Sequence, residues 1–180
     1  MLKKSSKLIK LLKNEKNDID SLLQYVPLEK FNRKISANEW SIAQVVSHIY
    51  LAESQTLDAI KWRVENKTAF PTPPLSSYFR VFYAVLLFKL KIKMKAPSFV
   101  TPSEAFVNKD ELLENWQQTR RDWSEFVYTF PNKLEGRVVY KHPIMGYLSL
   151  ALALTFMYHH LLRHKSQIIK LIDTQYPTSN

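Results

Sequence analysis

Residues 149–173 read SLALALTFMYHHLLRHKSQIIKLID, and this stretch decides the fold class of the 180-residue chain. Its first half is almost entirely apolar, and its second half repeats apolar residues at helical spacing. Such periodicity indicates an α-helix, and an apolar surface that extends around the helix indicates deep burial. The stretch therefore predicts a long helix that is the most buried helix of the protein.

Three further helices are expected, and the second of them has the sharpest start. Ser41 with Gln44 fits a capping box, in which the serine oxygen accepts a backbone N–H and the glutamine reaches back. Trp40 and Val45 are placed to form the hydrophobic staple beside this cap. Together with the last helix, the expected helices cover about residues 5–25, 41–66, 109–129 and 149–173.

A long crossover, residues 67–108, separates the second and third expected helices. Its first part, FPTPPL, predicts an irregular connection, and SSYFRVFYAVLLF predicts a further helical segment. The following KLKIKMKAP alternates lysine with apolar residues, which indicates an extended segment lying across the helices. Four long helices with one long crossover predict an all-α four-helix bundle, formed by a single domain over residues 1–180.

The composition excludes several classes of protein. Only two glycines occur, so glycine-rich phosphate loops and dinucleotide fingerprints are excluded. The absence of cysteine excludes disulfides, thiolate metal sites and cysteine nucleophiles. No secretory signal is recognisable, and the most apolar run is far shorter than the roughly 20 residues that span a bilayer. We expect a cytoplasmic protein without a transmembrane segment.

The formal net charge of +10, from 26 basic and 16 acidic residues, is a weak indicator of partners. Such a charge attracts nucleic acid or anionic membranes without specificity. No nucleic-acid recognition motif accompanies it, so specific nucleic-acid binding is not expected. A solvated, lysine-rich surface is the favoured interpretation.

Three of the five histidines lie in the segment YHHLLRHKSQI, residues 158–168. At about 100° per residue, His160 and His164 lie about 40° apart on one helical face, whereas His159 points about 100° away from His160. Two histidines four residues apart are a spacing used to bind metals. His48, on the second helix, is the obvious third ligand, because ligand sites in bundles are built from facing helices. A hydrogen-bonded histidine pair without metal is the alternative.

Three segments resemble proteins of the DinB-like (YfiT-type) superfamily. NEWSIAQVVSHIYLAE, residues 38–53, is similar to the helix start that carries this family's first metal-binding histidine. KAPSFVTPSE, residues 95–104, is similar to its proline-containing crossover. HPIMGYLSLALALTFMYHHLLRHKSQI, residues 142–168, is similar to its last helix, with a His-Pro turn and a glycine in front. The resemblance covers about residues 30–173 in the expected order.

The resemblance implies a DinB-like four-helix bundle with the long crossover, and a divalent metal ion held by three histidines. By motif, the ligands fall on His48, His160 and His164. Zinc or nickel is favoured, and iron or copper also suits imidazole ligands. His159 matches no ligand position and is expected at the surface or the edge of the core. His142, in the His-Pro turn, is expected to be structural, with a place facing a substrate as the alternative.

Three neutral imidazoles leave coordination positions open, which is typical of catalytic sites. Such an ion can lower the pKa of bound water to about 7 and polarise a carbonyl, or activate a thiolate. The resemblance accordingly implies a metal-dependent hydrolase or a transferase for low-molecular-weight thiols, acting on an unidentified small molecule, and it favours a homodimer. Proton-transfer residues stay unassigned: Gln44, Gln55, Glu53 and Gln167 are nearby candidates, and for each a solvated helix position is favoured.

Two alternatives of a different class stay open. The first is a non-catalytic, stress-related metal-binding module. In the second, the basic and aromatic stretch YFRVFYAVLLFKLKIKMK, residues 78–95, binds a membrane surface or a partner. A core helix followed by a lysine-edged loop is favoured over this second alternative.

Overall fold

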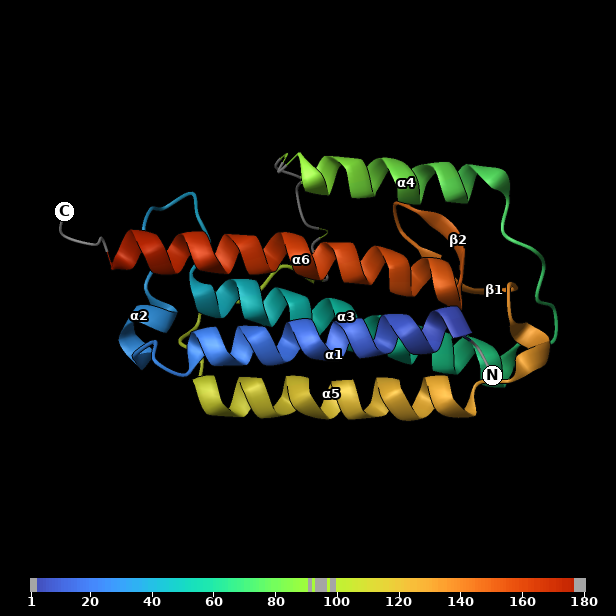
Figure 1. The fold of residues 1–180 in the computed structure, drawn as a ribbon, viewed down its shortest axis with the longest axis horizontal. Helices are drawn as coiled ribbons and strands as arrows, with labels where there is room; N and C mark the ends of the chain where they lie inside the picture. Colours follow the sequence, from blue (N-terminus) through green and yellow to red (C-terminus); the bar gives the residue numbers. More distant parts are fainter. Residues whose placement is uncertain (1–2, 91, 93–96, 98–99, 177–180) are drawn as a thin grey trace.

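A computed structural model describes residues 3–90, 92, 97 and 100–176 of the chain. Four long helices run side by side and form the bundle (Figure 1). They are α1 (Lys3–Leu23), α3 (Ile42–Asn66), α5 (Lys109–Thr129) and α6 (Leu150–Gln175). Helices α1 and α3 each contact both α5 and α6, which closes the bundle around one core. The predicted all-α bundle with a long crossover between its second and third long helices is confirmed.

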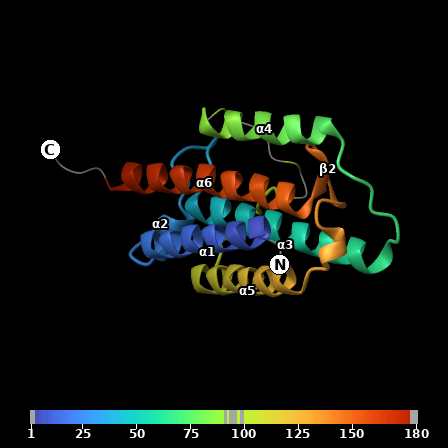
Figure 2. The ribbon, with the colours of Figure 1, turned by 45° about the vertical axis from the view of Figure 1, so that its right-hand side comes forward.

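Shorter elements complete the fold. They are α2 (Leu28–Asn32), α4 (Leu75–Lys89), the 3-10 helix η2 (Asn132–Leu134), and the strands β1 (Val138–His142) and β2 (Gly146–Ser149). Helix α4 belongs to the crossover and packs on the outer side of α6, away from α5 (Figures 1 and 2). The strands form an antiparallel hairpin between α5 and α6.

Side-chain caps explain where three of the long helices begin, and the cap at Ser41 was predicted. Ser41 and Gln44 form both hydrogen bonds of the capping box: the Gln44 N–H donates to the serine Oγ over 3.2 Å, and the Ser41 N–H donates to the glutamine Oε1 over 3.0 Å. The Asn108 side chain accepts from two backbone N–H groups of α5, and Ser149 caps α6. Cap residues satisfy donors that the first helical turn leaves free, so they fix these starts. The predicted bounds agree with the observed ones to within two residues.

The crossover was predicted in part. Its helical segment is confirmed as α4. The expected extended segment falls on residues 89–97, of which 91 and 93–96 lie outside the described residues. The β1–β2 hairpin was not predicted, although Val138, Val139 and Tyr140 are typical strand residues and Gly146 supplies the positive φ of 77° at its turn.

The core between α3 and α5 contains a buried carboxyl group, that of Glu53, so the expectation of a solvated residue is wrong here. Glu53 is 1% exposed and accepts hydrogen bonds from Arg120 Nη2 and, over 2.8 Å, from Trp116 Nε1. Burial raises the pKa of the Glu53 carboxyl, and the Arg120 guanidinium opposes that rise. Glu53 therefore faces another helix rather than water.

No helix in the described part of the chain is long and apolar enough to cross a bilayer.

Candidate metal centre

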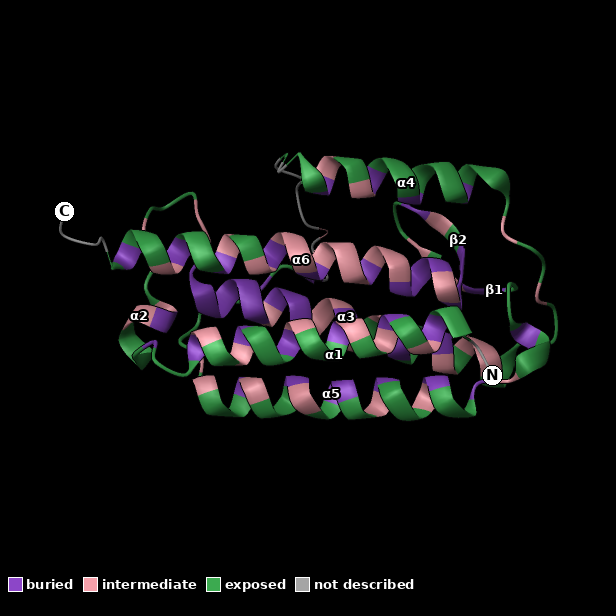
Figure 3. Cartoon of the chain, in the orientation of Figure 1, coloured by how far each residue is buried: buried purple, intermediate pink, exposed green. Residues whose placement is uncertain are grey.

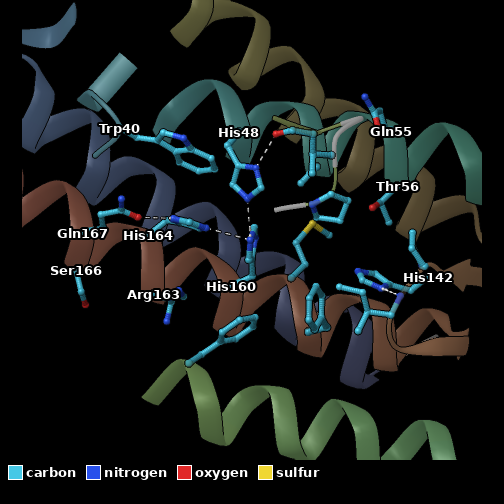
Figure 4. A pocket seen from close by; sticks show the side chains of 18 of the residues that line it. Trp40, His48, Gln55, Thr56, His142, His160, Arg163, His164, Ser166 and Gln167 are labelled. Atoms are coloured by element: carbon cyan, nitrogen blue, oxygen red, sulfur yellow. Dashed lines mark hydrogen bonds between the residues drawn. The ribbon is translucent and has the colours of Figure 1, made fainter. Parts of the chain in front are cut away.

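The three histidines predicted as ligands meet between α3 and α6 (Figure 4). His48 projects from α3, and His160 and His164 project from one face of α6. One ring nitrogen from each lies within 4.8 Å of those of the other two. The Nε2 atom of His160 is 3.1 Å from Nε2 of His48 and 3.1 Å from Nε2 of His164. His48 and His164 are buried, and His160 is partly exposed.

Hydrogen bonds on the opposite ring nitrogens orient two of these rings. His48 Nδ1 lies 2.8 Å from the carbonyl oxygen of Val100, and His164 Nδ1 lies 2.9 Å from Gln167 Oε1. A carbonyl oxygen can only accept, so His48 Nδ1–H donates to the carbonyl oxygen of Val100. His164 Nδ1–H likewise donates to the side-chain oxygen of Gln167. The neutral rings of His48 and His164 therefore present the lone pairs of Nε2 to the centre of the cluster.

Counting protons shows what the cluster requires. Two Nε2 lone pairs face the Nε2 atom of His160, which carries at most one proton and can satisfy only one of them fully. Buried polar atoms are normally satisfied. A cation at the centre would accept all three lone pairs at once, which is the common arrangement for metal-binding histidines with a hydrogen-bonded second nitrogen.

The spacing of the nitrogen atoms also suits a cation. Two metal–nitrogen bonds of about 2.0–2.1 Å at a tetrahedral angle separate their nitrogen atoms by about 3.3–3.4 Å. The two Nε2 distances of 3.1 Å lie close to that separation. The cluster can therefore hold one divalent ion with small side-chain adjustments.

The electrostatics of the cluster keep the rings neutral. Burial, followed by proximity to His48, lowers the pKa of His164 to about 3, while the bond to Gln167 opposes the shift. Burial, followed by the neighbouring histidines, lowers the pKa of His160 well below its ordinary value of 6.5. Burial also lowers the pKa of His48. Neutral imidazole is the form that binds metals, so the rings are ready to act as ligands at neutral pH.

A cavity of about 570 Å³ adjoins the cluster. Apolar and aromatic side chains form much of its wall, including those of Trp40, Phe88, Phe156 and Met157. Pro97 and Val100 also line it, so the crossover covers part of the site. A mostly apolar pocket with a few converging polar groups is the usual form of a small-molecule site.

His142 is one of these polar groups and reaches the cavity from the end of β1 (Figure 4). Its Nδ1 accepts from the backbone N–H groups of Ile144 and Met145, both over 3.1 Å. The proton of the neutral ring therefore resides on Nε2. His142 thus holds the hairpin turn, as predicted, and also faces the pocket, which was the stated alternative.

The other residues considered in the sequence lie in different parts of the structure. Gln44 is buried in the helix cap, so the expectation of a solvated residue is wrong for it. Gln55 lines the cavity, and the Gln167 side-chain oxygen accepts a hydrogen bond from His164. His159 lies outside the cluster and is partly buried, as expected. Sequence reasoning missed Thr56, Tyr140 and Arg163 in the cavity wall, because neither spacing nor motif marked them.

The fold and site together define a class: helical-bundle proteins with a buried cluster of three histidines that can hold a metal ion. The chain belongs to the DinB superfamily, whose model matches residues 11–168. It is also similar to the uncharacterized protein YuaE of Bacillus subtilis (strain 168), with 26% identity over 140 residues that cover 78% of this chain and 82% of that protein.

Gln167→Leu is expected to weaken metal binding, because His164 loses the acceptor that fixes its ring and its proton. Loss of such a supporting hydrogen bond typically costs about 10–100-fold in metal affinity. Competition with a chromophoric chelator measures the change. Gln167→Glu retains an acceptor and should bind at least as well as the wild type, and the neighbouring Ser166→Ala should be neutral. Equal affinities for Gln167→Leu and wild type would show that this bond does not support the site.

The metal-free protein should lose stability in mild acid, and His142 should contribute. Burial lowers the pKa of His142 from 6.5 to about 4 in the folded protein. The unfolded chain therefore binds a proton there first, and stability falls as the pH drops from about 6.5 towards 4. His142→Asn, whose side-chain oxygen can still accept from the turn, should reduce the slope by up to about 1.4 kcal/mol per pH unit. Urea unfolding in chelator across this pH range tests it, and identical slopes would contradict it.

Proposed function

We propose that this protein is a divalent-metal-dependent enzyme in which His48, His160 and His164 are the metal ligands. The observation that carries the proposal is the convergence of three Nε2 atoms at the wall of a cavity large enough for a small organic molecule. Catalytic sites commonly use three protein ligands and leave the next position to water or substrate. The reaction is hydrolysis or S-transfer with a low-molecular-weight thiol.

Zinc or nickel suits this ligand set best, and iron and copper also bind imidazole. When bound, the ion supplies a Lewis acid that polarises a carbonyl and activates water or a thiol. The protein's own contribution is to hold the imidazoles neutral and oriented, through Val100 and Gln167. The aromatic walls of the cavity restrict water around the reacting groups.

Three polar side chains in the cavity are suited to binding the substrate. Neutral His142 can donate from Nε2. Burial raises the pKa of Tyr140, so its hydroxyl stays protonated and can donate at neutral pH. Arg163 lines the cavity, and within the described part of the chain its buried Nη1 has no hydrogen-bond partner, so it is suited to an anionic group.

The test is turnover by metal-stripped protein before and after adding one equivalent of zinc or nickel. The substrates are chromogenic esters and amides for hydrolysis, and a chlorodinitrobenzene electrophile with small thiols for S-transfer. We expect metal to restore one of these activities in the wild type and in His159→Ala but not in His164→Ala. A metal-loaded protein that turns over none of them would favour the non-catalytic metal-binding module instead.

A further inference from the structure

Helix α4 presents a line of large apolar residues to solvent. Leu75, Phe79, Phe82, Leu86 and Leu90 follow one another at intervals of three or four residues and form a continuous line, here called the α4 outer stripe. Phe79 is 71% exposed, Phe82 is 69% exposed and Leu75 is 76% exposed. The helix is correspondingly exposed along its outer side (Figure 3). Contiguous apolar patches of this kind mark interaction sites.

The opposite side of α4, which packs on α6, is made mainly of smaller residues. Its buried positions are Ser77, Val81, Ala84 and Phe88. Apart from Phe88, the helix therefore buries smaller side chains and exposes its aromatic ones, the reverse of what packing onto a core requires. The expectation that this segment is a core helix holds for its inner side alone. The α4 outer stripe is left free to contact a binding partner.

The charge of the sequence around the stripe indicates what kind of partner surface the stripe can bind. No acidic residue occurs between Glu65 and Glu104 in the sequence, whereas this interval contains six basic residues. Two of them, Arg80 and Lys89, lie on α4 itself and are exposed. An aromatic stripe in a sequence interval whose charged residues are all basic complements a surface that is both apolar and anionic.

A second copy of the chain fits this surface poorly. Joining two α4 outer stripes about a twofold axis would bring two purely basic segments together, because such an interface pairs a patch with itself. Nucleic acid would match the charge but would leave the apolar stripe in water. The boundary between headgroups and acyl chains of an anionic bilayer matches both features.

We propose that α4 docks the protein on the surface of an anionic membrane, with the α4 outer stripe inserted among the lipid headgroups. The helix lies on the surface and does not span the bilayer. Binding combines apolar burial with electrostatic attraction and therefore weakens as salt increases. The inner side of the same helix reaches the metal centre, since the Phe88 ring lies 5.7 Å from the His160 ring. Docking would thus hold a wall of the cavity against the lipid surface.

The experiment is flotation of the full chain with vesicles, using Phe79→Gln/Phe82→Gln as the test variant. Vesicles of phosphatidylcholine with 30% phosphatidylglycerol are compared with pure phosphatidylcholine at low and moderate salt. The control is Tyr25→Gln/Tyr128→Gln, which removes two aromatic residues that are 82% and 88% exposed elsewhere. We expect wild type and control to bind the anionic vesicles, and the test variant to bind about tenfold or more weakly. Because both phenylalanines are exposed, thermal unfolding should be unchanged.

Three results would overturn the proposal, and a fourth would contradict its electrostatic part. The wild type could fail to float with anionic vesicles, or the test variant could bind as well as the control. Light scattering could also show a wild-type dimer that the test variant converts to a monomer, which would assign the stripe to self-association. Stronger flotation of Arg80→Gln/Lys89→Gln than of wild type would contradict the electrostatic part. None of these results depends on metal binding or turnover.

Discussion

His160→Ala should abolish high-affinity binding of zinc or nickel. The Nε2 atom of His160 is the one that lies 3.1 Å from both other Nε2 atoms, so its removal leaves two histidines with a gap between them. The loss should exceed the roughly 10–100-fold cost of losing a supporting hydrogen bond. Isothermal titration calorimetry, with competition by a chelator for the wild type, measures both affinities.

The matched control for this variant is His159→Ala. His159 is the adjacent residue of α6, and it does not belong to the three-histidine cluster. The His159→Ala variant should bind metal with the affinity of the wild type. The metal-free His160→Ala protein should remain folded, since the change also relieves the crowding of three ring nitrogens around one proton. Wild-type affinity in His160→Ala, or an equal loss in His159→Ala, would refute the assignment.

Glu53→Ala should be the most destabilising single substitution considered. It removes the carboxylate that accepts from the buried Arg120 guanidinium, and it leaves the Trp116 N–H without its acceptor. Breaking a buried ion pair by removing one partner costs about 3–5 kcal/mol. A domain with about 5–15 kcal/mol of total stability would lose a large part of it. Chemical denaturation of the metal-free protein measures the difference.

Two further variants test whether the Arg120 charge, left without the Glu53 carboxylate, causes the loss of stability. Glu114→Gln removes the carboxylate of the solvent-exposed pair with Arg121 and should leave stability almost unchanged. Glu53→Leu/Arg120→Met replaces both buried charges with apolar groups and should recover much of the stability lost in Glu53→Ala, because no buried charge is left alone. A cost below about 1 kcal/mol for Glu53→Ala would mean that water reaches Arg120 and that the pair is not part of the core.

The long helices could be predicted because their signals are local. Ser41 and Asn108 mark helix starts through hydrogen bonds to residues two or three positions away, so the sequence contains both partners. Periodicity likewise placed His160 and His164 on one face. Their meeting with His48 depends on how α3 and α6 pack. The expected bundle architecture made His48 a candidate third ligand, and the resemblance to a known family implied the full set of three.

The features that were missed depend on contacts distant in sequence. Glu53 looks like a solvated helix residue until α5 brings Arg120 and Trp116 against it, 67 and 63 residues further along. His142 acquires a place in the cavity through the hairpin, which needs both of its strands to form. The exposed aromatic side of α4 could not be predicted, because hydrophobicity alone assigns large apolar residues to the core.

The most direct test of the three-histidine metal centre is anomalous diffraction from crystals grown with zinc or nickel, collected on both sides of the metal's absorption edge. We predict one strong peak between α3 and α6, about 2.0–2.2 Å from Nε2 of each of His48, His160 and His164. A peak held instead by His142 or His159, or no peak within bonding distance of the three rings, would contradict the account.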